Sequence, residues 1–271
     1  MDTKSRPQHA LLFVSLSLSA FGCTGDLGDE ESTVDDVNVA QHALFESGEY
    51  SLGLDSPIQT DLGSSATQTC FLSGVLGNLH DRASSIGEAS VSVRPNASGH
   101  YILSVHPTAG KPLRVFTRCV ALTAGRTKEV DWNSSMHAAS VVAQVIPNRH
   151  CFLTSISSRG GFGNATDHVK IRSNGFYYYL DGSGEVSATA QCLDFAGADP
   201  EASWQAGNPG TRHDALTGPG PFGKSCFLTT VAGMFASNSY SDGVYVSYDS
   251  TDKRFYMNTT NGKLARSICV K

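Results

Sequence analysis

The sequence predicts an all-β protein made of three tandem, disulfide-braced antiparallel β units of about four short strands each. Two observations carry this prediction. The tetrapeptide Cys-Phe-Leu-Ser/Thr begins at Cys70, Cys151 and Cys226, and a second cysteine follows 49, 41 and 43 residues later. Between the two cysteines of each copy, apolar and polar residues alternate with the period of a half-buried strand. No segment after position 22 shows convincing helical periodicity.

The similarity of the three copies extends beyond their cysteines and indicates a duplicated unit of about 75 residues. The predicted units are residues 47–122, 123–198 and 199–271. An aromatic residue precedes the first cysteine of each unit, at Tyr50, Trp132 and Trp204. Large rings at a fixed framework position usually bury their bodies, so we expect these three to support the fold rather than to bind a ligand.

Within each unit, short alternating segments are separated by turn residues. In the second unit, "HVKIR" and "FYYYL" flank Asn174-Gly175, a pair that favours a two-residue type I′ turn. "DGSGE" predicts the next turn, and "VSATAQC" returns to the second cysteine. The third unit has the corresponding segments "VYVSY", "KRFYM" and "KLARSIC", and the first has "SVSVR", "HYILSV" and "LRVFTRC".

The repeated cysteines predict one disulfide within each unit. Six cysteines allow 15 connectivities, and the repeat symmetry favours Cys70–Cys119, Cys151–Cys192 and Cys226–Cys269. Closing loops of this length stabilises a fold by about 4 kcal/mol in the chain-entropy model. In the strand "CFL", the cysteine and leucine point to one side and the phenylalanine to the other. Zinc sites need closely spaced ligand pairs, which these cysteines lack, so we expect no metal and no cofactor.

The first 22 residues predict a secretory signal. Lys4 and Arg6 precede an apolar run from Ala10 to Gly22 that is too short to span a membrane. The stretch "SAFGC" resembles the lipobox of bacterial lipoproteins, although Ala20 and Phe21 depart from the residues commonest there.

The resemblance to lipoproteins implies that Cys23 carries a lipid, that the chain is exported, and that it is anchored on an outer membrane, since Thr24 follows the cysteine. Cys23 is also the one cysteine outside the repeats, and a thioether would remove its free thiol. Cleavage of the same bond by an ordinary signal peptidase is the alternative. Residues 23–46 predict a solvated acidic tether, since positions 24–40 include six acids and no Lys or Arg: Asp26, Asp29, Glu30, Glu31, Asp35 and Asp36.

The composition and motifs exclude several classes of function. Residues 37–271 hold 18 acidic and 18 basic side chains, and this balance argues against nucleic acid, whose binding depends on phosphate neutralisation. Gly-Ser-Gly at Ser183 is better explained by a hairpin turn than by a nucleophile elbow. Asp181, Glu185 and Asp242 are predicted to be turn residues rather than a catalytic carboxylate pair. No histidine recurs at an aligned position in all three units.

The loops that follow "CFL" are the candidate recognition elements, because variable polar loops on a rigid β frame often carry binding sites. Phe162, Phe235 and Tyr240 lie in them and could stack on a sugar ring, although plain solvated connectors would have the same composition.

The repeats are similar to CFLT-type repeats of uncharacterised bacterial secreted proteins over residues 47–271, a resemblance that implies no known activity. The sequence therefore favours an envelope-anchored binding or adhesion protein, with a glycan or cell-surface ligand, over a hydrolase of envelope polymers.

We expect mass spectrometry of the envelope-isolated protein to find a chain that starts at a diacylglycerol-modified Cys23. A Cys23→Ser variant is the control, because it should lose the lipid mass and leave the envelope fraction. A mature N-terminus at another residue, or an unmodified Cys23, would contradict the resemblance.

Overall fold

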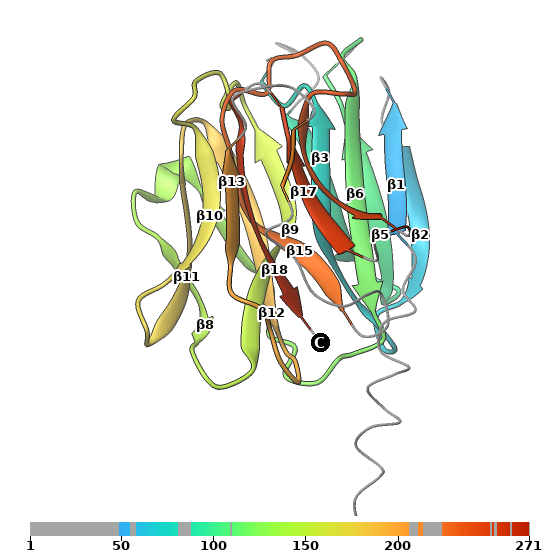
Figure 1. Ribbon diagram of the computed structural model, residues 1–271, viewed down its shortest axis with the longest axis vertical. Coiled ribbons are helices and arrows are strands. Elements are labelled where there is room, and N and C mark those ends of the chain that lie inside the picture. The colour runs from blue at the N-terminus through green and yellow to red at the C-terminus, as the bar shows by residue number, and fades with distance from the viewer. Residues whose placement is uncertain are drawn as a thin grey trace, which may run out of the picture. The chain divides into compact units, whose positions relative to one another are not determined.

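The structure, a computed structural model, consists almost entirely of antiparallel strands (Figure 1). It describes residues 49–54, 58–80, 88–108, 110–205, 211–213, 224–249, 251, 254–260 and 262–270. The predicted signal, Cys23 and the tether lie outside these residues. The all-β fold class is confirmed, and within the described residues the helical conformation is confined to one 3-10 turn, η2 (Ser134–Met136).

Within the described ranges, each unit contributes six strands. The first has β1 (Glu49–Leu54), β2 (Ile58–Ser64), β3 (Thr69–Gly77), β4 (Ala89–Pro95), β5 (His100–His106) and β6 (Leu113–Val120). The second has β7 (Val130–Asn133), β8 (Ser140–Gln144), β9 (Arg149–Ser158), β10 (His168–Ser173), β11 (Tyr177–Ser183) and β12 (Val186–Asp194). The third has β13 (Ala202–Gln205), β14 (Thr211–His213), β15 (Ser225–Ala232), β16 (Gly243–Asp249), β17 (Arg254–Thr259) and β18 (Leu264–Val270).

The strands form three six-stranded sheets, and every sheet is shared by two units. Sheet I has the order β1-β6-β3-β16-β17-β14, sheet II β2-β5-β4-β9-β12-β7, and sheet III β13-β18-β15-β10-β11-β8. The first, third and sixth strands of a unit thus pair in one sheet, while its second, fourth and fifth pair in the next. In sheet I, β16 of the third unit pairs with β3 of the first, and Figure 1 shows β17 and β3 as members of this shared sheet. No unit completes a sheet alone, so the three units fold as one body.

The repeated tripeptide "CFL" places its side chains in two separate clusters, as the strand alternation predicts. The cysteines and leucines of all three copies lie in the main core, which collects apolar side chains from all three sheets. The phenylalanines turn to the other side. Phe71, Phe152 and Phe227 are fully buried and pack against one another, with ring centroids 5.0, 5.1 and 5.0 Å apart.

Three further equivalent residues complete this second cluster. Val120, Leu193 and Val270 each follow the second cysteine of their unit, and all three are buried beside the phenylalanines. Phe195 adds an edge-on contact with Phe152 at 5.9 Å. We call this group the phenylalanine cluster. It joins the three units through residues that occupy the same position in each.

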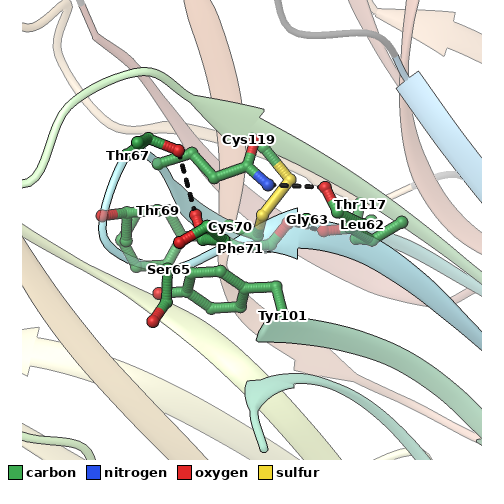
Figure 2. Close-up of a disulfide and its surroundings, with 12 residues drawn as sticks. Leu62, Gly63, Ser65, Thr67, Thr69, Cys70, Phe71, Tyr101, Thr117 and Cys119 are labelled. Carbon is green, nitrogen blue, oxygen red and sulfur yellow. Dashed lines mark hydrogen bonds between the residues drawn. A yellow bond between two sulfur atoms is a disulfide. The ribbon is translucent and has the colours of Figure 1, made fainter. Parts of the chain in front are cut away.

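The structure has the three disulfides within the units that the repeat predicts: Cys70–Cys119, Cys151–Cys192 and Cys226–Cys269. Each joins directly opposite residues of a unit's third and sixth strands. Figure 2 shows the first of them, with Tyr101 of β5 beside it. Tyr101 is buried, and this burial raises the pKa of its phenol, whose oxygen lies 3.4 Å from Oε1 of Gln191 in the second unit.

The six strands per unit exceed the four that the sequence indicates, because the first two strands of each unit have no strong alternation. β2, for example, reads "IQTDLGS" and has no buried residue, and it is held as an edge strand by pairing with β5. The turn at Asn174-Gly175 also differs from the predicted two-residue type. β10 ends at Ser173 and β11 begins at Tyr177, while the Asn174 side chain accepts hydrogen bonds from the backbone of Phe176 and Tyr177. The side chain thus stabilises a three-residue loop.

The strand register corrects the alignment of the three aromatic residues. Trp132 and Trp204 lie opposite Ala188 and Ala265, each four residues before its unit's second cysteine. In the first unit, the equivalent residue is Leu52, which lies opposite Val115, and not Tyr50. Trp132 is buried and donates from Nε1 to Ala138 O at 3.0 Å, and Trp204 packs partly buried against the core, as expected of framework rings. The prediction for Tyr50 is wrong, since it is 37% exposed.

A buried ion pair joins two loop ends in the third unit. Nζ of Lys263, 1% exposed, lies 2.5 Å from Oδ1 of Asp242 and 5.2 Å from the centre of the Phe235 ring. Burial raises the pKa of Asp242, but hydrogen bonds from Lys263 and Thr260 and the charge of Lys263 outweigh this, so the net pKa lies below the usual value of 3.8. The ionised pair therefore stabilises the fold above that pH.

Replacing Phe152 by alanine should lower the free energy of unfolding by about 3–5 kcal/mol, because it leaves a cavity where three units meet. Urea unfolding followed by circular dichroism measures this. Phe176→Ala is the matched control, since that ring is 74% exposed, and it should change stability by less than ~0.5 kcal/mol. Equal effects of the two changes would contradict the role of the cluster.

Removing the Asp242 carboxylate should uncover the buried Lys263 charge and cost about 3–5 kcal/mol. Because the folded pKa of Asp242 is lowered, its contribution is present above pH 3.8 and disappears as the pH falls below that value. The difference in unfolding free energy between Asp242→Ala and the unchanged protein should therefore narrow as the pH is lowered from 6 to 3. A constant gap across this range would exclude the pair as a source of stability.

Candidate ligand-binding face

The outer face of sheet II carries small polar side chains in register across its strands. Val91, Ile156, Ala188 and Trp132 point into the core, so their strand neighbours point outward. One row of directly opposite residues crosses all six strands: Gln59, Ser104, Ser92, Ser155, Thr189 and Asp131. A second row crosses five strands: His106, Ser90, Ser157, Ser187 and Asn133. Most of these residues carry hydroxyl groups.

Hydrogen bonds join the central hydroxyls of the first row. Oγ of Ser155 lies 3.2 Å from Oγ1 of Thr189, which in turn lies 2.6 Å from Oδ1 of Asp131. These contacts run from β9 through β12 to β7. The first row therefore ends on a carboxylate at the β7 edge of the sheet.

The second row is joined in the opposite direction. Oγ of Ser187 lies 2.5 Å from Oγ of Ser157, which lies 2.8 Å from Oε2 of Glu88, the residue before β4. Arg159 forms an ion pair with the same carboxylate. On the β4 side, Nε of Arg94 lies 2.7 Å from Oε2 of Glu129, and its Nη2 lies 3.7 Å from Oδ1 of Asp131. The hydroxyl rows thus lie between charged groups that are themselves paired.

The parts of the two rows on β9, β12 and β7 line a groove of about 700 Å³, which is a volume typical of small-molecule sites. Its floor is formed by Ser155 and Ser157 of β9 and Ser187 and Thr189 of β12. The rest of the lining comes from β4, β7, β12 and the adjoining turns: Glu88, Arg94, Asp131, Trp132, Asn133, Ser134, Ser135, Arg159, Glu185, Val186 and Ala188. A second hollow of about 520 Å³ lies on sheet III and shares Trp132 and Ser134 with the first.

The corresponding faces of the other sheets have different chemistry. On sheet I, Phe116 and Tyr245 lie on either side of Gly74 and stack over it, with centroids 5.4 Å apart. A Cβ at Gly74 would come within 2.4 Å of Tyr245 Cβ, so this contact depends on the glycine. On sheet III the matching row is charged: Ser203, Arg266, Thr230, Lys170 and Asp181. The hydroxyl groove of sheet II has no counterpart on these two faces among the described residues.

The loops after "CFL" do not form the predicted aromatic platforms. Phe162 and Phe235 are fully buried, with ring centroids 5.3 Å apart, and Leu79 is buried at the matching place of the first unit. Backbone bonds run from Leu79 N to Phe235 O and from Phe235 N to Phe162 O. The prediction that these two rings stack on sugar is wrong, because the loops use them to join the units. Tyr240 is 38% exposed.

The candidate catalytic groups have structural partners. Asp181 lies in β11 rather than in a turn, where it pairs with Arg172 at 2.5 Å and Lys170 at 3.7 Å. Glu185 and Asp242 do lie in turns, before β12 and β16. Oγ of Ser183 lies 2.9 Å from Nδ1 of His168, but both groups also contact Thr166 O, at 2.8 and 2.9 Å. Since Ser183 donates to that carbonyl, its hydrogen is not directed at the imidazole.

The groove itself could have been suspected from the sequence. "SVSVR", "TSISS" and "VSATA" each place hydroxyls at alternate positions, and alternation puts them on one face of a strand. The sequence did not predict that these three strands are neighbours, because β4 belongs to a different unit from β9 and β12.

Comparison with known proteins gave no match to a family model and no match to a curated protein. In the part of the chain that the structure describes, no three metal-ligating side chains gather in one place. The same residues include no helix with the length and apolarity needed to cross a membrane.

Proposed function

We propose that this protein is an exported, envelope-anchored binding or adhesion protein that takes a carbohydrate in the hydroxyl groove of sheet II. The observation that carries the proposal is the double row of in-register hydroxyl and carboxylate groups on the groove floor. Sugars are recognised by many hydrogen bonds from a surface that is already organised, and the strands of a sheet hold these groups rigidly. The three disulfides support export, because they persist in oxidising compartments.

The lipid on Cys23 and the acidic tether of residues 23–46 complete the proposal. They would hold the folded body at a membrane surface, on a solvated segment long enough to let it reach a neighbouring polymer. The groove is formed by residues of the first and second units, and the matching faces of the other sheets differ from it. We therefore place one principal site on each chain rather than three equivalent sites.

A hydrolase acting on envelope polymers is the second candidate, because Glu88, Asp131 and Glu185 all line one groove. Against it, Glu88 is held by Arg159 and Ser157, and Asp131 is held by Thr189. Carboxylates fixed in this way stabilise the groove and are poorly placed to donate a proton to a leaving group.

A glycan-array screen of the protein from residue 24 onward should give at least one hit, which Ser187→Leu should weaken by at least tenfold by filling the groove. Ser203→Leu is the matched control, because it places the same side chain on the outer face of sheet III and should leave binding unchanged. No hit on the array, or a hit that Ser187→Leu leaves intact, would contradict carbohydrate binding at the groove of sheet II. Release of shortened oligosaccharides from a bound polymer would instead establish the hydrolase.

A further inference from the structure

We infer that the groove takes a neutral, extended β-linked polysaccharide that lies across the strands, with the sugar hydroxyls donating and the protein accepting. This inference rests on the proposed function and names its ligand class. Three features of the described groove lead to it: the direction of its hydrogen bonds, the pairing of its charges and the spacing of its rows.

The direction of both hydroxyl chains is fixed by the carboxylates on which they end. A carboxylate only accepts, so Thr189 must donate its one hydroxyl hydrogen to Asp131. Ser155 must then donate to Thr189. The hydrogen of Ser155 is thereby used within the protein, and only lone pairs of this oxygen remain for a ligand.

The direction of the hydrogen bonds in the second row follows in the same way, and these bonds run across the strands in the opposite sense. Ser157 must donate to Glu88, so the 2.5 Å contact between the two serines requires that Ser187 donate to Ser157. Ser187, like Ser155, is left with free acceptor positions. The floor of the groove is therefore organised to accept hydrogen bonds, and a ligand must supply the donors.

The charges of the groove disfavour an acidic ligand. Its lining includes three carboxylates, Glu88, Asp131 and Glu185, and two arginines. Both arginines already hold carboxylates, Arg94 with Glu129 and Arg159 with Glu88. An anionic sugar would have to break one of these pairs and would meet the acceptor-rich floor. The hydroxyls of a neutral sugar supply donors without that cost.

The spacing of the rows indicates an extended chain. Neighbouring strands lie ~4.8 Å apart, so the run from β4 through β9 and β12 to β7 covers about 14 Å. That spacing is close to the length of one sugar ring along an extended β-linked polysaccharide. A chain lying across the strands can therefore present successive rings to Ser155, Thr189 and Asp131 in turn, whereas a strongly coiled α-linked polymer cannot.

The test uses isothermal titration of the protein from residue 24 onward with cellohexaose, xylohexaose and mannohexaose, and with oligogalacturonate as the acidic probe. We expect at least one neutral β-linked hexamer to bind and oligogalacturonate not to bind. For a hexamer that binds, analogues with one class of hydroxyl replaced by fluorine or by hydrogen reveal the direction of the bonds. Fluorine still accepts weakly but cannot donate, so both replacements should lower affinity alike, by about tenfold, for at least one class of hydroxyl.

Thr189→Val sharpens this test, because valine has nearly the same shape but cannot accept the Ser155 hydrogen. That hydrogen is then released toward the groove, and the fluorine analogue should bind the variant better than the hydrogen analogue does. Thr230→Val on sheet III is the matched control and should reproduce the unchanged protein. Retained affinity of the fluorine analogue for the unchanged protein would show that the groove donates, and would overturn the inference.

Other outcomes separate this inference from the proposed function. Binding of oligogalacturonate or α-linked glycans alone, abolished by Ser187→Leu, would overturn the ligand class and leave carbohydrate binding at the groove standing. An array and titrations without any glycan binding would overturn both.

Discussion

The mutual contact of Phe71, Phe152 and Phe227 is the constraint on which the rest of this structure depends. Three equivalent rings meet at nearly equal distances, so each unit is positioned against the other two at once. The same strands carry the cysteine and leucine on their other side, where the main core lies. A strand buried on both faces cannot slip by one residue without exchanging the two clusters, and so the register of all three units is fixed together.

Sharing of sheets follows from this central packing. Each unit is small and would bury too little apolar surface alone. By giving three strands to each of two sheets, it completes the sheets of both neighbours, and the disulfide joins its third strand to its sixth. The loops at Leu79, Phe162 and Phe235 add a second apolar contact between units. Cooperative unfolding of the three units is the natural consequence.

The outer faces are free of these constraints, and there the three units differ. The position four residues after the first cysteine holds Gly74, Ser155 or Thr230, and these make an aromatic stack, a hydroxyl row and a charged row on sheets I, II and III. Repetition thus builds the frame, while the groove proposed to bind a sugar results from departure from repetition. A site made of short side chains on adjoining strands needs no flexible loop, which suits binding to an extended polymer.

The sequence by itself determined the local features of this protein: the all-β class, the strands between the cysteines, the disulfide pairs and the opposite directions of Cys and Phe in "CFL". These depend on alternation and spacing, which are properties of neighbouring residues. It misassigned Phe162 and Phe235 as exposed and Tyr50 as a framework ring, because burial and register depend on what another segment supplies. Only the tertiary structure decided that β4 lies beside β9, and therefore that Glu88 and Arg94 of the first unit share one groove with the serines of the second. The physical reason is that antiparallel pairing leaves little trace in either strand of which partner it will take, since backbone hydrogen bonds are the same for every residue.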